Sequence, residues 1–238
     1  MTNQSGAAVI AGVPSLVALP VDLRPGLPAV IWCHGFRADA LAHARELERC
    51  AAAGFIAIGI DAVGHGARRD PDLASRLHRS PGGALPVMLQ VVDDTVHEMP
   101  ALLDALVREY AMDRSRVSMV GISMGAFIAY RCIASGIRLR SVIALLGSPE
   151  RPDALSPHVL PMRFRDVALL SITAEHDASV PPAPVVAFHR VLDADTLRRA
   201  PARHHVLRGT GHLTSAPEWD EAMHETLDWL RREGLRRT

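Results

Sequence analysis

The sequence of 238 residues has the length of one large domain, and its 26 basic residues balance its 26 acidic residues. A formal charge of zero gives no field that would attract nucleic acid, so we expect a small-molecule substrate and no nucleic-acid partner. Every basic residue is arginine, which excludes a Walker A lysine, a Schiff-base lysine and a Ser-x-x-Lys hydrolase.

The stretch 7–19 is apolar, as in the core of a signal peptide, but the first basic residue is Arg24. Since a cleaved signal begins with a positive segment, we expect an edge β-hairpin here instead. Cys33, Cys50 and Cys132 are widely spaced and form no C-x-x-C pair, which predicts a reduced, cytoplasmic protein without a structural zinc. No apolar run reaches 18 residues, so we expect no membrane span.

From residue 29 onward, short apolar runs alternate with longer amphipathic stretches. Runs that are apolar on both faces predict strands of a covered parallel sheet, at 29–33, 55–60, 116–121, 141–147, 167–173 and 203–208. Helices are expected between them, at 39–53, 91–110, 124–135, 182–194 and 217–233. The alternation predicts an α/β fold in a single domain over 1–238, with a mostly parallel central sheet and helices on both faces.

Two segments, 67–89 and 148–166, are rich in proline and too long for ordinary connections. We expect them to form a small cap over the substrate. Their apolar side chains are then candidates to line the pocket: Leu85, Met88, Met162 and Phe164.

The strongest motif is Gly121-Ile122-Ser123-Met124-Gly125, between the strand 116–121 and the helix that follows. A serine at such a turn projects its hydroxyl above the carboxyl edge of the sheet, beside the first amides of the helix. The flanking glycines relieve crowding around this turn. The motif therefore predicts that Ser123 is a catalytic nucleophile.

A serine hydroxyl becomes a useful nucleophile only when a base takes its proton. His212 follows the last predicted strand, on the same edge of the sheet as Ser123, whereas His204 and His205 begin that strand at its far edge. Asp177 leaves the strand 167–173 at its carboxyl end and can orient His212. Glu175 and Glu150 remain open as rival acids, because each also follows a predicted strand.

The tetrahedral intermediate needs two backbone donors. One is the amide of Met124, next to the nucleophile, and the other is the amide of Phe36 in the loop His34-Gly35-Phe36. We expect His34 chiefly to anchor this loop by hydrogen bonds, and we count it among the tentative pocket residues.

The motifs HGF at 34–36, DAVGHG at 61–66, GISMG at 121–125, HDASVP at 176–181 and GTGH at 209–212 together resemble the α/β-hydrolase superfamily. Within it, the sequence looks most like small bacterial esterases of the dienelactone-hydrolase and prolyl-oligopeptidase-like group. It departs from both neighbours, since dienelactone hydrolases carry cysteine at the elbow and prolyl oligopeptidases carry a large additional domain. The resemblance implies a cofactor-free carboxylesterase that cleaves small or medium acyl esters.

Other functions use the same machinery. A thioesterase, lactonase, amide hydrolase or acyltransferase remains open, as does a non-catalytic binding protein of the same fold and a homodimeric assembly.

Asp61 and His65 are expected to shape the pocket floor. Asp93, Asp94, His97 and Glu98 have spacings that could hold a metal, but they equally form the polar face of a helix, which we favour.

Overall fold

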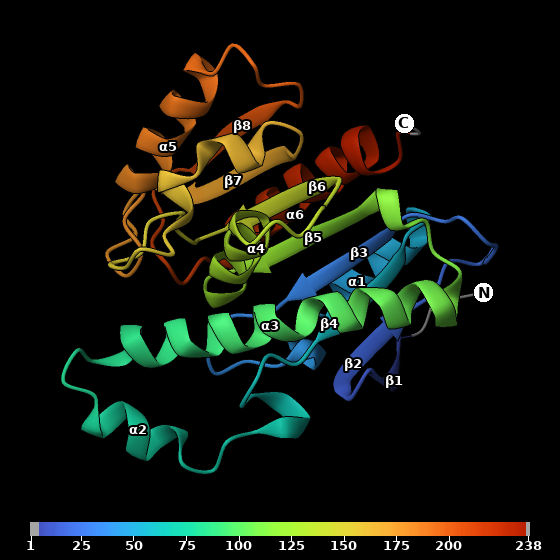
Figure 1. The fold of residues 1–238 in the computed structure, drawn as a ribbon, viewed down its shortest axis with the longest axis horizontal. Coiled ribbons are helices and arrows are strands. Elements are labelled where there is room, and N and C mark those ends of the chain that lie inside the picture. Colours follow the sequence, from blue (N-terminus) through green and yellow to red (C-terminus); the bar gives the residue numbers. More distant parts are fainter. Residues whose placement is uncertain (1–4, 237–238) are drawn as a thin grey trace.

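The computed structural model describes residues 5–236 and has one eight-stranded sheet at its centre (Figure 1). The sheet order is β1-β2-β4-β3-β5-β6-β7-β8. The pairs β1–β2 and β2–β4 are antiparallel, and all the others are parallel. The strands span Ser5–Ile10 (β1), Val13–Ala18 (β2), Ala29–Cys33 (β3), Ile56–Ile60 (β4), Val117–Ile122 (β5), Ser141–Leu145 (β6), Ala168–Ala174 (β7) and Ala202–Leu207 (β8).

The six predicted strands are all present, with ends shifted by at most about two residues, and the expected edge hairpin is formed by β1 and β2. Central strands such as β4 are buried along their whole length, because helices cover both faces of the sheet. The helices span Ala44–Ala52 (α1), Leu73–Arg79 (α2), Ala84–Tyr110 (α3), Met124–Ala134 (α4), Ala183–Ala194 (α5) and Ala216–Trp229 (α6).

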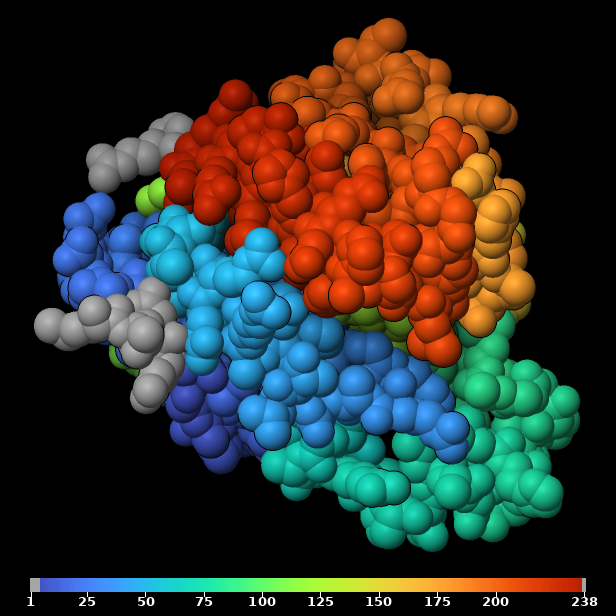
Figure 2. Space-filling view, turned by 180° about the vertical axis from the view of Figure 1, so that it is seen from behind, coloured from blue at the N-terminus to red at the C-terminus, as the bar shows by residue number. Residues whose placement is uncertain are grey.

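The two faces of the sheet support separate hydrophobic cores. One core packs α3, α4 and α5 against the sheet, and the other packs α1 and α6 against the opposite face. Seen from behind, α1 and α6 lie side by side on the surface, where Trp219 Nε1 donates a hydrogen bond to Glu46 Oε1 at 3.1 Å (Figure 2). No helix within residues 5–236 has both the length and the apolar content needed to cross a membrane.

The segment 67–89 is more ordered than its proline content suggested. It contains α2 and the first turns of α3, which begins at Ala84 rather than near residue 91. Pro86 fits because it lies in the first turn, where the amide would have no helical acceptor. The segment 148–166 instead holds two short 3₁₀ turns, at Pro157–Val159 and Pro161–Phe164.

The parallel arrangement determines where the site lies. Cys33 at the end of β3 pairs with Gly121 near the end of β5, and Ala174 at the end of β7 pairs with Leu207 at the end of β8. The loops that follow these four strands therefore emerge along the same edge of the sheet, which is where α/β proteins bind ligands.

Candidate active site

Ser123 joins β5 to α4 with φ of 52° and ψ of −113°, a backbone conformation that is rare outside glycine. The turn is so tight that its flanking positions must be glycine. A Cβ at Gly121 would lie 2.0 Å from the carbonyl oxygen of Gly125, and a Cβ at Gly125 would lie 2.0 Å from that of Cys33. The glycine spacing thus lets the strand turn directly into the helix and holds Ser123 at the carboxyl edge.

Ser123, His212 and Asp177 are joined by two hydrogen bonds. Ser123 Oγ lies 3.0 Å from His212 Nε2, and His212 Nδ1 lies 2.7 Å from Asp177 Oδ2. Asp177 is buried, and its other oxygen accepts the amides of Ser179 at 2.9 Å and Val180 at 2.8 Å. These amides fix the carboxylate, so that Nδ1 donates to it and Nε2 faces the serine hydroxyl.

The rival acids have other surroundings. The carboxylate of Glu175 accepts hydrogen bonds from the Arg208 guanidinium at 3.0 Å and from the amide of Gly209 at 2.9 Å, so its partners are other than His212. The backbone amide of Gly209 and the Arg208 guanidinium lower the pKa of Glu175. Glu150 makes no hydrogen bond to His212 among the described residues and lines a cavity described below.

The two competing histidines on β8 are also engaged elsewhere. His204 Nε2 lies 2.8 Å from Thr173 Oγ1, and His205 Nε2 lies 2.7 Å from Glu221 Oε1. Of the three histidines compared, only His212 contacts Ser123.

The two amides that the sequence suggests as oxyanion donors are those of Met124 and Phe36. Met124 begins α4, where the first amides have no acceptor within the helix. Phe36 lies in the loop after β3, and its amide makes no backbone hydrogen bond among residues 5–236. Both amides are therefore available to a ligand oxygen at this edge of the sheet.

His34 anchors the Phe36 loop from beneath. Its Nδ1 lies 2.7 Å from the carbonyl oxygen of Gly35, and its Nε2 accepts the amide of Ala62 at 3.0 Å. Burial lowers the pKa of His34 to about 4, so the ring is neutral at pH 7 and can accept that hydrogen bond. His34 does not line the cavity beside Ser123, and its placement among the pocket residues is corrected accordingly.

Asp61 and His65 complete the support for this loop. Asp61 accepts the amides of Ala40 at 2.9 Å and Ala67 at 2.7 Å. The ring of His65 packs against that of Phe36, with centroids 5.3 Å apart. Neither side chain lines the cavity beside Ser123; they hold its surroundings in place.

A cavity of about 520 Å³ opens beside Ser123 and His212. Segments 67–89 and 148–166 both contribute to it. Its polar lining comprises Ser148, Glu150, Arg151 and Ser179, and its apolar lining comprises Phe36, Ala84, Leu85, Met88, Phe127, Pro152, Val180, Pro181 and Pro184. Leu85 and Met88 are thus at the cavity, as the sequence predicted.

Two predicted pocket residues lie elsewhere. Phe164 is completely buried in the core, where its ring centroid is 5.0 Å from that of Phe188 and 6.3 Å from that of Tyr130. Met162 is about half exposed and lines a separate surface hollow with Arg163. Hydrophobicity alone predicted contact with substrate for both, but it does not determine which surface a side chain faces.

Phe127 was missed by the sequence analysis although a signal was present. It lies four residues after Ser123 on α4, and residues at that spacing share a helix face. The same argument does not reach Val180, Pro181 and Pro184, whose position depends on the path of the loop after Asp177.

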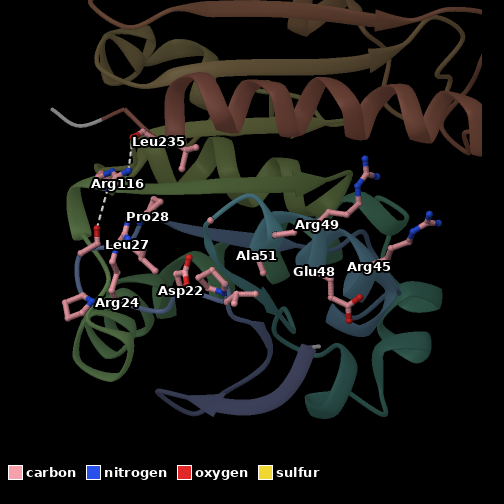
Figure 3. A pocket seen from close by; sticks show the side chains of 16 residues that line it. Asp22, Arg24, Leu27, Pro28, Arg45, Glu48, Arg49, Ala51, Arg116 and Leu235 are labelled. Carbon is pink, nitrogen blue, oxygen red and sulfur yellow. Dashed lines mark hydrogen bonds between the residues drawn. The ribbon is translucent and has the colours of Figure 1, made fainter. Parts of the chain in front are cut away.

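A second, larger cavity, of about 850 Å³, lies at the opposite edge of the sheet (Figure 3). There Pro28 and Arg116 precede β3 and β5, and Arg116 donates to the carbonyl oxygens of Gly26 at 3.3 Å and Leu235 at 2.7 Å. The residues that line it include no serine, cysteine or histidine, so it offers no nucleophile and base.

Two of the residues considered as metal ligands, Asp93 and Glu98, are paired with arginines. Asp93 accepts hydrogen bonds from Arg131 and Arg151, and Glu98 accepts one from Arg68. Within residues 5–236, no group of three or more histidine, cysteine or acidic side chains has the arrangement of a metal site.

Comparison with known proteins identifies the family and the fold of this chain. A family model described as serine aminopeptidase, S33, matches residues 27–160. Esterase YjfP of Escherichia coli (strain K12) is 31% identical over 140 residues, which cover 58% of this chain and 53% of that protein. The match thus spans about half the length of this curated relative.

Solved structures show the shared fold. TT1662 from Thermus thermophilus matches with a TM-score of 0.79 and 21% identity over 100% of both chains. Acylaminoacyl peptidase from Pyrococcus horikoshii matches with a TM-score of 0.76 and 14% identity, over 100% of this chain and 43% of that one.

Proposed function

This chain belongs to the S33 serine aminopeptidase family and has the α/β-hydrolase fold, and from this premise we propose that it is a serine hydrolase that cleaves small or medium acyl esters. One observation carries the proposal most directly. The hydrogen-bonded chain from Ser123 through His212 to Asp177 lies at the wall of a largely apolar cavity.

The proposed reaction passes through an acyl-enzyme. Ser123 Oγ attacks the ester carbonyl while His212 Nε2 takes its proton, and Asp177 stabilises the resulting imidazolium. The amides of Phe36 and Met124 donate to the oxyanion, which carries more charge in the transition state than the carbonyl does in the substrate. His212 then gives its proton to the leaving alcohol, and the same ring activates the water that releases the acid.

The cavity supports the proposed substrate size. Its volume of about 520 Å³ lies within the range of small-molecule sites, and the side chains of Leu85, Met88 and Phe127 give it an apolar wall. We propose that segments 67–89 and 148–166 form the small cap of this site. The curated relative is named an esterase, which favours an ester over an amide as the substrate.

A panel of p-nitrophenyl esters of graded acyl length tests the proposal, run beside thioesters and lactones. We expect hydrolysis of the esters to be greatest at short or medium chains and to fall by at least about 10⁴-fold in Ser123→Ala. Ser179→Ala is the matched control, because it removes another hydroxyl from the same cavity. A maximum at long chains would contradict the proposed size, and a preference for thioesters or lactones would favour the corresponding alternative.

We also propose a cytoplasmic location, because all three cysteines are buried and free. Fractionation of cells that carry the native gene tests this, and recovery in an extracytoplasmic fraction would contradict it.

Sedimentation velocity distinguishes a monomer from the homodimer that the sequence leaves open.

A further inference from the structure

Glu150 is an acidic side chain in the wall of a largely apolar cavity. It follows β6, it is exposed, and it lines the same cavity as Ser123 and His212. Its backbone amide donates to Ser148 Oγ at 3.0 Å. Within residues 5–236, its carboxylate has no arginine or histidine within ion-pair distance.

The neighbouring guanidinium is paired with two other carboxylates. Arg151 donates to both oxygens of Asp93 at 2.8 Å, and to Asp153 Oδ2 at 3.1 Å from Nε and 2.9 Å from a terminal nitrogen. Its side chain is only 3% exposed. Because two carboxylates already compensate this positive charge, Arg151 adds little attraction for an anion in the cavity.

The balance of charge in the cavity is therefore negative. Its ionisable lining consists of Glu150, Arg151 and His212, and the last of these is paired with Asp177. Glu150 is the member without a partner of opposite charge among the described residues. The aromatic rings of Phe36 and Phe127 line the same space, and aromatic faces also attract cations.

We propose that Glu150 determines specificity, by favouring esters that carry an ammonium or quaternary amine close to the scissile carbonyl. The inference rests on the proposed esterase function and names its substrate class. A cation in the cavity would be drawn to the carboxylate, whereas an anionic group would be repelled by it.

Two matched substrate pairs test the inference. The p-nitrophenyl ester of alanine is compared with p-nitrophenyl isobutyrate, which has a methyl group in place of the ammonium. Acetylcholine is compared with 3,3-dimethylbutyl acetate, which has carbon in place of the quaternary nitrogen. The first pair places the cation on the acyl side, and the second places it on the alcohol side.

The measured quantity is the ratio of kcat/KM for the cationic ester to that for its neutral partner. We expect this ratio to fall by about fivefold in Glu150→Gln for at least one pair, the size expected of a partly exposed ion pair. The value of kcat/KM for the neutral esters should change less than that for the cationic esters. Glu109→Gln, which removes the same charge at the far end of α3, should leave every ratio unchanged.

If the acyl pair shows the effect, pH gives a second readout. The effect of Glu150→Gln on the ratio for the alanine ester should disappear as the amine of that ester loses its proton, at a pH of about 8. An effect on the quaternary amine should persist, because that cation cannot lose a proton.

Ratios that are equal in wild type and Glu150→Gln for both pairs would overturn the inference. An equal loss on neutral and cationic esters would also overturn it, since Glu150 would then act on the chemistry itself. If the wild-type protein hydrolysed no ester of either pair, the proposed function would fail and the inference with it. If the wild-type protein hydrolysed only the neutral esters, the proposed function would stand and the inference would fail.

Discussion

Asp177 uses its two carboxylate oxygens for different partners. One oxygen accepts two backbone amides of its own loop, and the other lies 2.7 Å from His212 Nδ1. Because these amides hold the carboxylate in place, the loop after β7 sets the orientation of the imidazole ring.

Asp177→Asn should lower kcat by about 10³- to 10⁴-fold, because an amide can present a donor to Nδ1 and favour the wrong imidazole tautomer. The measurement is kcat on p-nitrophenyl acetate. Glu175→Gln is the control, since that carboxylate contacts Arg208 and Gly209 instead. If Glu175→Gln lost as much activity as Asp177→Asn, the acid would be misassigned.

The residues nearest the hydroxyl could be predicted from the sequence because their order and spacing are determined by the strands they follow. Ser123 and Asp177 each follow a recognisable apolar run, and His212 follows the more polar strand β8. The pocket was harder to predict. Phe164 and Met162 are as apolar as Leu85 and Met88, but only the folded path of 148–166 turns the first pair away from the cavity.

At the scale of elements, Asp93 links three parts of the molecule that surround the cavity. It projects from α3, accepts Arg131 Nε of α4 at 3.0 Å, and holds both terminal nitrogens of Arg151 in the segment 148–166. Burial opposes ionisation of Asp93, but the hydrogen bonds and positive charges of Arg151 and Arg131 together outweigh it and lower the pKa of Asp93. The charged pair thus ties the cavity wall to the helix that carries Ser123.

Asp93→Asn should raise KM several-fold while changing kcat much less, because the wall moves but the reacting groups do not. The same variant should lower the free energy of unfolding by about 1–3 kcal/mol, since the buried Arg151 loses part of its compensation. Steady-state kinetics and urea unfolding measure both effects.

Asp94→Asn is the matched control for this variant. Asp94 is the next residue of α3, and its hydrogen bond to Gln90 at 2.8 Å lies on the exposed side of that helix. An Asp93→Asn variant with wild-type KM and wild-type stability would show that the link does not support the cavity.

The elements that the sequence misjudged are those around the cavity. Pro81, Gly82, Gly83 and Pro86 favour a loop, yet α3 begins immediately after Gly83. Proline is compatible with the first turn of a helix, so the composition alone could not distinguish a loop from a helix start. The strands were easier, because burial on both faces leaves a continuous apolar signal.

At the scale of the whole molecule, histidines buried on different elements couple folding to pH. Burial lowers the pKa of His34 and of His189 to about 4, and it also lowers the pKa of His43 and His204. At the rings of His34 and His189, the unfolded chain takes up protons near pH 6.5, whereas the folded chain does so only near pH 4.

Stability should therefore fall as the pH drops below about 6.5, because the unfolded state binds more protons there. Between pH 7.5 and pH 5, His34 and His189 should each cost the folded state about 2 kcal/mol. Urea unfolding at the two pH values measures this difference. The difference in unfolding free energy between the two pH values should be smaller by about 2 kcal/mol in His189→Gln. It should be unchanged in His78→Gln, where the ring is exposed. Equal stability at both pH values would contradict the expectation.

The global arrangement was predictable in class but not in detail. Alternating strands and helices predicted a covered parallel sheet, and the sheet has that form from β4 to β8. The sequence did not predict that two hydrophobic cores would divide the helices as α3, α4 and α5 against α1 and α6. That division depends on which face of the sheet each connection between strands crosses, and the apolar content of the sequence does not determine this.

Covalent labelling with a fluorophosphonate probe tests the central claim most directly, because the probe reacts with a serine only where a base and an oxyanion site activate it. Mass spectrometry of the digested protein should find one adduct, on Ser123, in the wild type. It should find none in folded Ser123→Ala. A wild-type protein that stays unlabelled, or an adduct that persists in Ser123→Ala, would contradict the assignment of Ser123 as the nucleophile.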